Sequence, residues 1–137
     1  MMDNTPEYIE MCRKAKDIQA SWELKFGDYY WFQDKIEIAL WLQSPGNIIR
    51  HAMYYQWELP RKMVDCTWLP RQDQLQDMTF NLREDDCFDA ECLLIDFKRY
   101  VNEKCEPKLT HSFEKMWLAF VVDFYQKKWD GKDWIKI

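Results

Sequence analysis

The residues with the clearest potential for chemistry form an acidic run in the second half of the chain. Five carboxylates occur within eight residues, at Glu84, Asp85, Asp86, Asp89 and Glu91. Calcium and magnesium take oxygen ligands of this kind, so a metal-dependent enzyme acting on nucleic acid is one hypothesis. The run lacks the glycine of a calcium-binding loop, and carboxylates at the start of a helix also favour the helix dipole. We therefore expect a solvated helix start, with no metal site and no cofactor.

Cysteine and histidine offer a second set of candidate ligands. Cys87, Cys92, Cys105 and His111 fall within 25 residues, but they lack the closely paired cysteines of a structural zinc site. No Gly-x-Ser-x-Gly elbow is present, and neither histidine has a visible orienting partner. The sequence thus predicts no catalytic residue. Five cysteines, an odd number without a close pair, favour a reducing compartment.

A polar helix start is the strongest candidate for a binding surface. The predicted surface residues are Trp68, Arg71, Gln72, Asp73 and Gln76. The alternative is a structural role, in which hydrogen bonds and an ion pair tie this helix start to the preceding strand. Replacing Arg71 by Ala distinguishes the two roles, because only the functional role predicts lost partner binding at unchanged stability.

Aromatic residues in the predicted sheet form another candidate surface. They are Tyr29, Tyr30, Trp31, Trp41, Tyr54, Tyr55 and Trp57, with Arg50, Arg61, Lys62 and Arg71 nearby. Such a surface could stack single-stranded nucleic acid, but 24 acidic against 19 basic residues and a net charge of −5 work against phosphate binding. We therefore expect core packing and contact with a protein partner or a homo-oligomer, with nucleic acid the less favoured partner.

The first half of the chain predicts one helix followed by strands. Thr5 can cap a helix and Pro6 suits its first turn, so a helix is predicted from Thr5 to about Ser21. Alternating and aromatic segments then predict strands, and Ser44-Pro45-Gly46-Asn47 is a strong turn. The predicted strands are Tyr29–Phe32, Ile36–Leu42, Arg50–Leu59 and Met63–Leu69.

The second half predicts three helices and a short tail. The helices are a polar one starting at Pro70 and reaching Leu82, one over Ala90–Lys104, and one over Thr110–Lys128. The predicted inner face of the middle helix is Leu93, Leu94, Phe97, Tyr100 and Val101. Asp130-Gly131 predicts a tight turn in the tail. Strands followed by helices, without strict alternation, indicate an α+β fold: a small antiparallel sheet of three or four strands packed against about four helices.

The helix over Thr110–Lys128 is predicted to be the centre of the core. Its core face has helical spacing and comprises Phe113, Met116, Trp117, Phe120, Val121 and Phe124. A narrow polar stripe of Lys115, Asp123 and Gln126 is left to face water. We expect the core face to lie on the aromatic sheet.

The chain as a whole predicts a single α+β domain over residues 1–137. Its most apolar run, Met116–Tyr125, is short of the roughly 20 residues that cross a bilayer, so no membrane is expected. No signal peptide is visible at the start, which favours a cytoplasmic location.

Several segments together resemble a family of small uncharacterised proteins of phages and prophages. The segments are Pro6–Cys12, Lys16–Gln19, Trp68–Gln76, Met116–Val121 and Trp129–Trp134. The most specific are Leu-Pro-Arg-Gln-Asp-Gln-Leu-Gln and the Trp-Asp-Gly tail. The resemblance implies a phage-related accessory protein in the cytoplasm of a bacterial host, and it carries over no catalytic residue.

Overall fold

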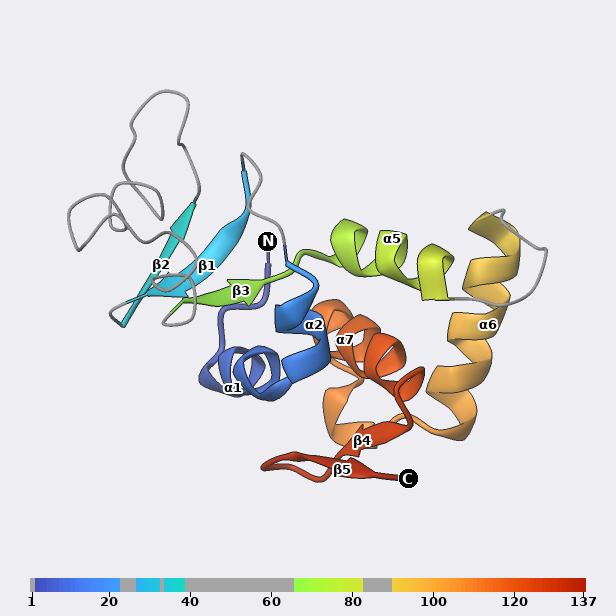
Figure 1. Ribbon diagram of the computed structural model, residues 1–137. Helices are drawn as coiled ribbons and strands as arrows, with labels where there is room; N and C mark the ends of the chain where they lie inside the picture. Colours follow the sequence, from blue (N-terminus) through green and yellow to red (C-terminus); the bar gives the residue numbers. More distant parts are fainter. Residues whose placement is uncertain (1, 23–26, 33, 39–65, 83–89) are drawn as a thin grey trace.

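The predicted α+β class is confirmed. The computed structural model describes residues 2–22, 27–32, 34–38, 66–82 and 90–137. These residues form five α-helices, one short 3-10 helix and two small antiparallel sheets (Figure 1). In chain order the elements are α1 (Pro6–Lys14), α2 (Lys16–Ala20), β1 (Tyr29–Phe32), β2 (Lys35–Ile38), β3 (Thr67–Leu69), α5 (Gln72–Leu82), α6 (Ala90–Glu103), η1 (Pro107–Leu109), α7 (Phe113–Asp123), β4 (Lys127–Trp129) and β5 (Trp134–Lys136).

The larger sheet has the strand order β2-β1-β3, and both of its strand pairs are antiparallel. Alternate residues of the central strand, Tyr30 and Phe32, are buried, as expected for a strand that packs one face on a core. Asp34 forms the turn to β2 with a positive φ of 62°, a conformation that aspartate tolerates better than most residues. The predicted hairpin of Tyr29–Phe32 with the following strand is therefore confirmed.

Part of the predicted strand set lies outside the described residues. The strand expected over Ile36–Leu42 is described as far as Ile38, and the strand expected over Arg50–Leu59 falls in the range 39–65, which is not described. The strand expected over Met63–Leu69 is observed as β3, Thr67–Leu69.

The first predicted helix is wrong in one respect, because it is divided at Ala15. Thr5 caps α1 through its side-chain oxygen and Pro6 opens the helix, as predicted. Ala15 then leaves the helical region at ψ 75°, and α2 starts at the next residue. The side chain of Gln19 donates a hydrogen bond of 3.0 Å to the carbonyl of Cys12. In a continuous helix the Cys12 carbonyl would accept a hydrogen bond from the amide of Lys16, so the Gln19 side chain compensates for the break.

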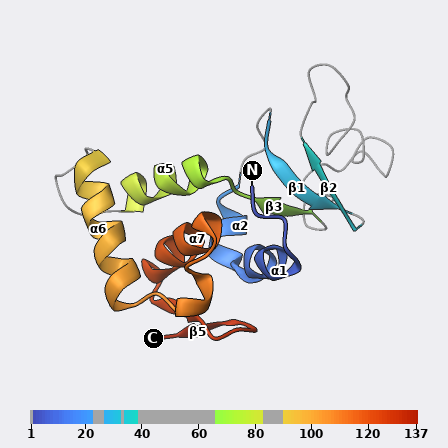
Figure 2. The same cartoon turned by 180° about the vertical axis from the view of Figure 1, so that it is seen from behind.

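α7 is the centre of the core, as predicted. Its residues are buried without interruption from Lys115 to Val122, and Ser112 caps its first turn. Trp117 stacks on Phe97 of α6 with ring centroids 3.8 Å apart. Figures 1 and 2 show α7 enclosed by α1 and α2, α5, α6 and the β4–β5 hairpin. The expectation that it lies on the aromatic sheet is wrong, because its main contacts are with α1, α5, α6 and β4, and the element that packs on β3 is α1.

The predicted ends and faces of this helix also need correction. It spans Phe113–Asp123 and does not reach Lys128, because Gln126 has a positive φ of 60° and Lys127–Trp129 pairs with β5. Phe113 and Phe124, predicted in the core, are exposed at the two ends. Lys115, predicted to face water, is 4% exposed, because the N-terminal segment covers it.

The C-terminal tail forms a hairpin that closes the core beside α1. Gly131 occupies the predicted turn with a φ of 104°, and the Asp130 carboxylate accepts hydrogen bonds from the amides of Lys132 and Asp133. These hydrogen bonds lower the pKa of the Asp130 carboxyl. The indole of Trp134 donates a hydrogen bond of 2.9 Å to the carbonyl of Met11, which joins the hairpin to α1.

Two further expectations about α6 and the cysteines are wrong. Leu94, predicted on the inner face of its helix, is 55% exposed, whereas Leu93 and Tyr100 are buried. Cys92 is disulfide-bonded, so the expectation that the cysteines are all reduced does not hold for it. Cys12 and Cys105 are free thiols, and burial raises the pKa of both.

Candidate functional site

The start of α5, predicted as a binding surface, is bound to the rest of the fold by Arg71. Its guanidinium contacts both carboxylate oxygens of Asp73, at 3.0 and 3.3 Å, and donates a 2.9 Å hydrogen bond to the carbonyl of Gly27. The Arg71 amide donates to the side chain of Gln74, which satisfies a backbone donor ahead of the helix. These are the contacts of the structural alternative. Gln72 and Gln76 are half-buried on the same helix.

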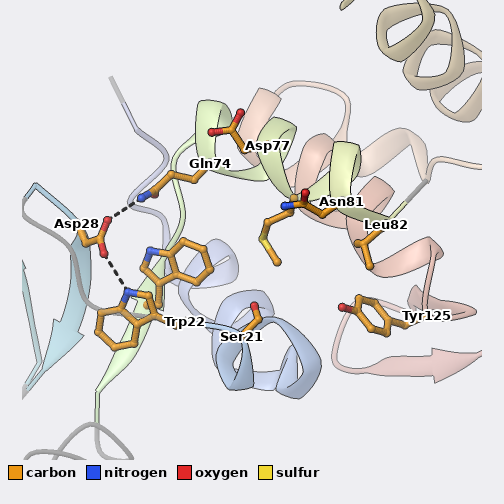
Figure 3. Close-up of a pocket in the computed structure, with 10 residues that line it drawn as sticks. Ser21, Trp22, Asp28, Gln74, Asp77, Asn81, Leu82 and Tyr125 are labelled. Atoms are coloured by element: carbon orange, nitrogen blue, oxygen red, sulfur yellow. Dashed lines mark hydrogen bonds between the residues drawn. The ribbon is translucent and has the colours of Figure 1, made fainter. Parts of the chain in front are cut away.

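A pocket of about 340 Å³ lies next to this helix start, between α2, β3, α5 and the end of α7 (Figure 3). Of the residues predicted for binding, Trp68 lines it, and Arg71, Gln72, Asp73 and Gln76 do not. The lining residues are Ser21, Trp22, Asp28, Trp68, Gln74, Asp77, Met78, Asn81, Leu82 and Tyr125. The pocket therefore collects residues from five separate segments of the chain.

A buried carboxylate stands at one end of the pocket. Asp28 accepts a hydrogen bond of 3.0 Å from the indole of Trp22 and one of 2.6 Å from the side-chain amide of Gln74. Figure 3 shows one donor at each oxygen of the carboxylate, Gln74 at Oδ1 and Trp22 at Oδ2. Two fixed donors hold the Asp28 oxygens in place before any ligand arrives, and such preorganisation reduces the entropy cost of binding.

Aromatic rings form a wall of the pocket. The rings of Trp22 and Trp68 are parallel within 2°, with their centroids 6.2 Å apart. Trp68 is buried, and its indole nitrogen has no hydrogen-bond acceptor among the described residues. Tyr125, which follows α7, lines the far end beside Leu82 (Figure 3). The pocket thus offers apolar, π-rich surface together with polar groups.

The lining is negatively charged. Asp28 and Asp77 are acidic, and none of the ten lining residues is Lys, Arg or His. Asn81 and Gln74 add neutral amides, and Ser21 and Tyr125 add hydroxyls. A partly desolvated site with carboxylates and aromatic faces suits a positively charged group.

Sequence reasoning missed most of this site. Gln74, Asp77, Met78 and Asn81 are spaced as one face of α5, so their shared face was available as a signal. Asp28 follows Gly27, a pair of residues typical of a turn, so its sequence context gives no sign of a binding role. Its role depends on the contact between the segment before β1 and Gln74 of α5, which spacing along the chain does not reveal.

A second polar cluster lies on the other side of the core, around Lys115. The Lys115 ammonium is 2.9 Å from Glu7 and 3.9 Å from Asp3, and Ser112 donates a hydrogen bond of 2.5 Å to Asp3. Burial raises the pKa of the Asp3 carboxyl, but hydrogen bonds from Ser112 and Thr5 and the charge of Lys115 outweigh it, so this pKa is lowered. Each buried charge has a partner, and the cluster fastens the N-terminal segment to α7.

The chemistry first suggested by the sequence receives no support from the described residues. Within them, no group of three or more His, Cys, Asp or Glu side chains could hold a metal ion. Glu91 is exposed on α6, and the remaining carboxylates of the acidic run, Glu84, Asp85, Asp86 and Asp89, lie outside the described part. The same is true of His51 and of Trp41, Tyr54, Tyr55 and Trp57 of the aromatic surface.

Comparison with known proteins gives no match that bears on the site. Neither a protein-family model, nor a curated protein, nor a solved structure matches the chain. In the described ranges, no helix has the length and apolar character needed to cross a bilayer.

Proposed function

We propose that the protein is a protein-binding module that takes a positively charged side chain, Arg or Lys, of a partner protein into the pocket between α2, α5 and α7. The observation that carries this proposal is the described lining of that pocket, which combines two carboxylates with three aromatic side chains and includes no Lys, Arg or His among its ten residues. A partner's guanidinium or ammonium group would bring a positive charge to this acidic, aromatic lining.

The chemistry of the pocket favours this occupant over a neutral one. A cation over the face of Trp or Tyr gains about 0.5–2 kcal/mol, depending on how well water is excluded. A hydrogen bond between a cation and a carboxylate is about twice as strong as one between neutral groups. An aliphatic stem, as in Arg and Lys, can also pack along Met78 and Leu82.

The same features count against other occupants. A phosphate or carboxylate ligand would be repelled by the carboxylates of Asp28 and Asp77, because like charges placed close together are unfavourable. A purely apolar ligand would cover the exposed Asp77 carboxylate and the half-buried Gln74 amide without replacing their contact with water. The biological setting that we propose, a phage-related accessory role in the cytoplasm of a bacterial host, rests on the sequence resemblance alone.

Titration with short end-blocked peptides tests the proposal. Three peptides of the form Gly-X-Gly, with X as Arg, Lys or Gln, would be added to the ¹⁵N-labelled full chain, and the indole N–H signals followed by NMR. We expect saturable shifts of the Trp22 and Trp68 indole signals with Arg or Lys, assigned through Trp22→Phe and Trp68→Phe. A single side chain gives weak affinity, with dissociation constants of about 1–10 mM.

A matched pair of variants separates the pocket from general charge effects. Asp77→Asn removes a charge from the lining, and we expect the affinity for the Arg peptide to fall about threefold, the scale of one exposed ion pair. Glu103→Gln removes the same charge from an exposed site on α6 that does not line the pocket, and should leave the affinity unchanged. Equal effects of the two variants would contradict binding in the pocket.

A further inference from the structure

The outer face of α6 carries two neighbouring apolar side chains that the fold leaves open. Leu94 is 55% exposed and Ile95 is 52% exposed, although the same helix buries Leu93 and Tyr100 against α7. Figures 1 and 2 both place α6 at the edge of the molecule, with one side turned away from the other helices. The exposed pair therefore lies where another molecule can reach it.

The residues around this pair have the spacing of a helix-pairing seam. Glu91, Leu94, Ile95 and Lys98 occur at i, i+3, i+4 and i+7, which places them on one face. All four are exposed. Leu93 and Tyr100, which are buried, and Phe97, which is partly buried, have the same kind of spacing on a different face. α6 thus has one seam that faces its own core and a second whose residues are exposed.

The charges of the second seam are arranged symmetrically about its apolar centre. Glu91 lies three residues before Leu94, and Lys98 lies three residues after Ile95. Neither charge has an ion-pair partner among the described residues of its own chain. If two α6 helices lie antiparallel with the two-fold axis between Leu94 and Ile95, each Glu91 faces a Lys98 of the other copy, and the apolar pairs meet between them.

We infer that the outer face of α6 is a self-association surface, on which α6 of a second copy of this chain packs in the antiparallel direction. An isologous interface needs a surface complementary to itself, and the order acid, two apolar residues, base meets this requirement when reversed. This inference is independent of the cationic side chain proposed for the pocket, because no residue of the seam lines that pocket.

The interface is small, so the dimer should be weak. Two apolar side chains from each copy and two ion pairs are at the lower end of specific interfaces, and we expect a dissociation constant of about 0.1–1 mM. Sedimentation equilibrium of the full chain from about 20 μM to about 1 mM covers this range. A chain that stays monomeric over the whole range would overturn the inference.

Charge reversal tests the antiparallel arrangement. Glu91→Lys alone and Lys98→Glu alone each place two like-charge contacts in the dimer, and each should weaken it about tenfold. The double variant Glu91→Lys/Lys98→Glu restores opposite charges at both contacts and should recover the wild-type affinity. Mixing the two single variants should also recover it, because one chain then carries two bases and the other two acids.

Arg99→Glu is the matched control. It makes the same charge change as Lys98→Glu at the adjacent exposed position, but in the antiparallel pair it lies opposite Ala90. We expect the affinity of the dimer to change less than twofold, as for an exposed residue without a charged partner. Circular dichroism of every variant checks that α6 is still formed. Pairing through this seam would be refuted if neither single charge reversal changed the dissociation constant of the dimer, or if Arg99→Glu raised it as much as they do.

Discussion

Replacing Lys115 by Met should destabilise the fold far more than removing any exposed lysine. The Lys115 side chain is 5% exposed and the Asp3 side chain is 7% exposed, so the variant leaves a buried carboxylate without its ammonium partner. Removing one member of a buried ion pair costs about 3–5 kcal/mol. Glu7 is 39% exposed and can be hydrated, and Asp3 keeps its hydrogen bonds from Ser112 and Thr5. The expected loss is therefore at the lower end, about 3 kcal/mol.

Urea unfolding followed by tryptophan fluorescence measures this loss. With an m value of about 1.5 kcal/mol/M, the midpoint should fall by about 2 M at an unchanged slope. Lys104→Met is the control, because it breaks an exposed ion pair of 3.5 Å with Asp123, and should cost less than about 1 kcal/mol. Asp3→Asn combined with Lys115→Met should recover part of the loss, since no charge then stays buried alone. Equal losses for Lys115→Met and Lys104→Met would refute the importance of the cluster.

Two other predictions concern stability. The pKa of the Asp3 carboxyl is lowered in the folded chain, so the unfolded chain binds more protons near pH 3.8. The stabilisation from Asp3 is therefore complete above that pH, and it is lost as the pH falls through the folded-state pKa. Asp3→Asn should therefore flatten the dependence of the unfolding free energy on pH below about pH 4, and an unchanged slope would contradict this origin. Gln19→Leu removes a side chain that exchanges hydrogen bonds of 2.8 and 2.9 Å with the Trp68 backbone and donates one of 3.0 Å to the Cys12 carbonyl. This variant should lower the free energy of unfolding by about 2 kcal/mol and speed hydrogen exchange at the Trp68 amide. A loss under about 0.5 kcal/mol would show that water replaces Gln19.

Local signals were sufficient for the elements whose limits are set by neighbouring residues. Thr5 and Pro6 start α1, Asp130-Gly131 turns the last hairpin, and the aromatic run from Tyr29 forms a strand. Each of these depends on capping, on backbone conformation or on side-chain alternation within a few residues. The α+β class followed from the order of such elements.

Contacts between distant segments decided the features that sequence reasoning missed. Helical spacing put Lys115 in a polar stripe, but the N-terminal segment with Asp3 and Glu7 lies over it and buries it. Leu94 neighbours the buried Leu93, and spacing alone did not separate the face covered by α7 from the open face. The helix is divided at Ala15, and Gln19 compensates by donating hydrogen bonds to the carbonyls of Cys12 and Trp68. None of these partners is visible in local periodicity.

The candidate site illustrates the same limit. Trp68 was among the residues predicted for binding, and it lines the pocket. Arg71 and Asp73, predicted with it, pair with each other at the start of α5. The residues that give the pocket its charge, Asp28 and Asp77, come from different elements, and only the packing of α5 near β1 brings them to one cavity.

The ratio of the affinities for the Arg and Gln peptides, measured on the full chain by NMR titration, is the most direct test of the proposed function. We expect the Arg peptide to bind at least about tenfold more tightly than the Gln peptide, with saturation at the Trp22 and Trp68 indole signals. Asp77→Asn should reduce this ratio, and Glu103→Gln should not. Equal affinities for the two peptides, or shifts at indole signals other than Trp22 and Trp68, would contradict a pocket that selects a positively charged side chain.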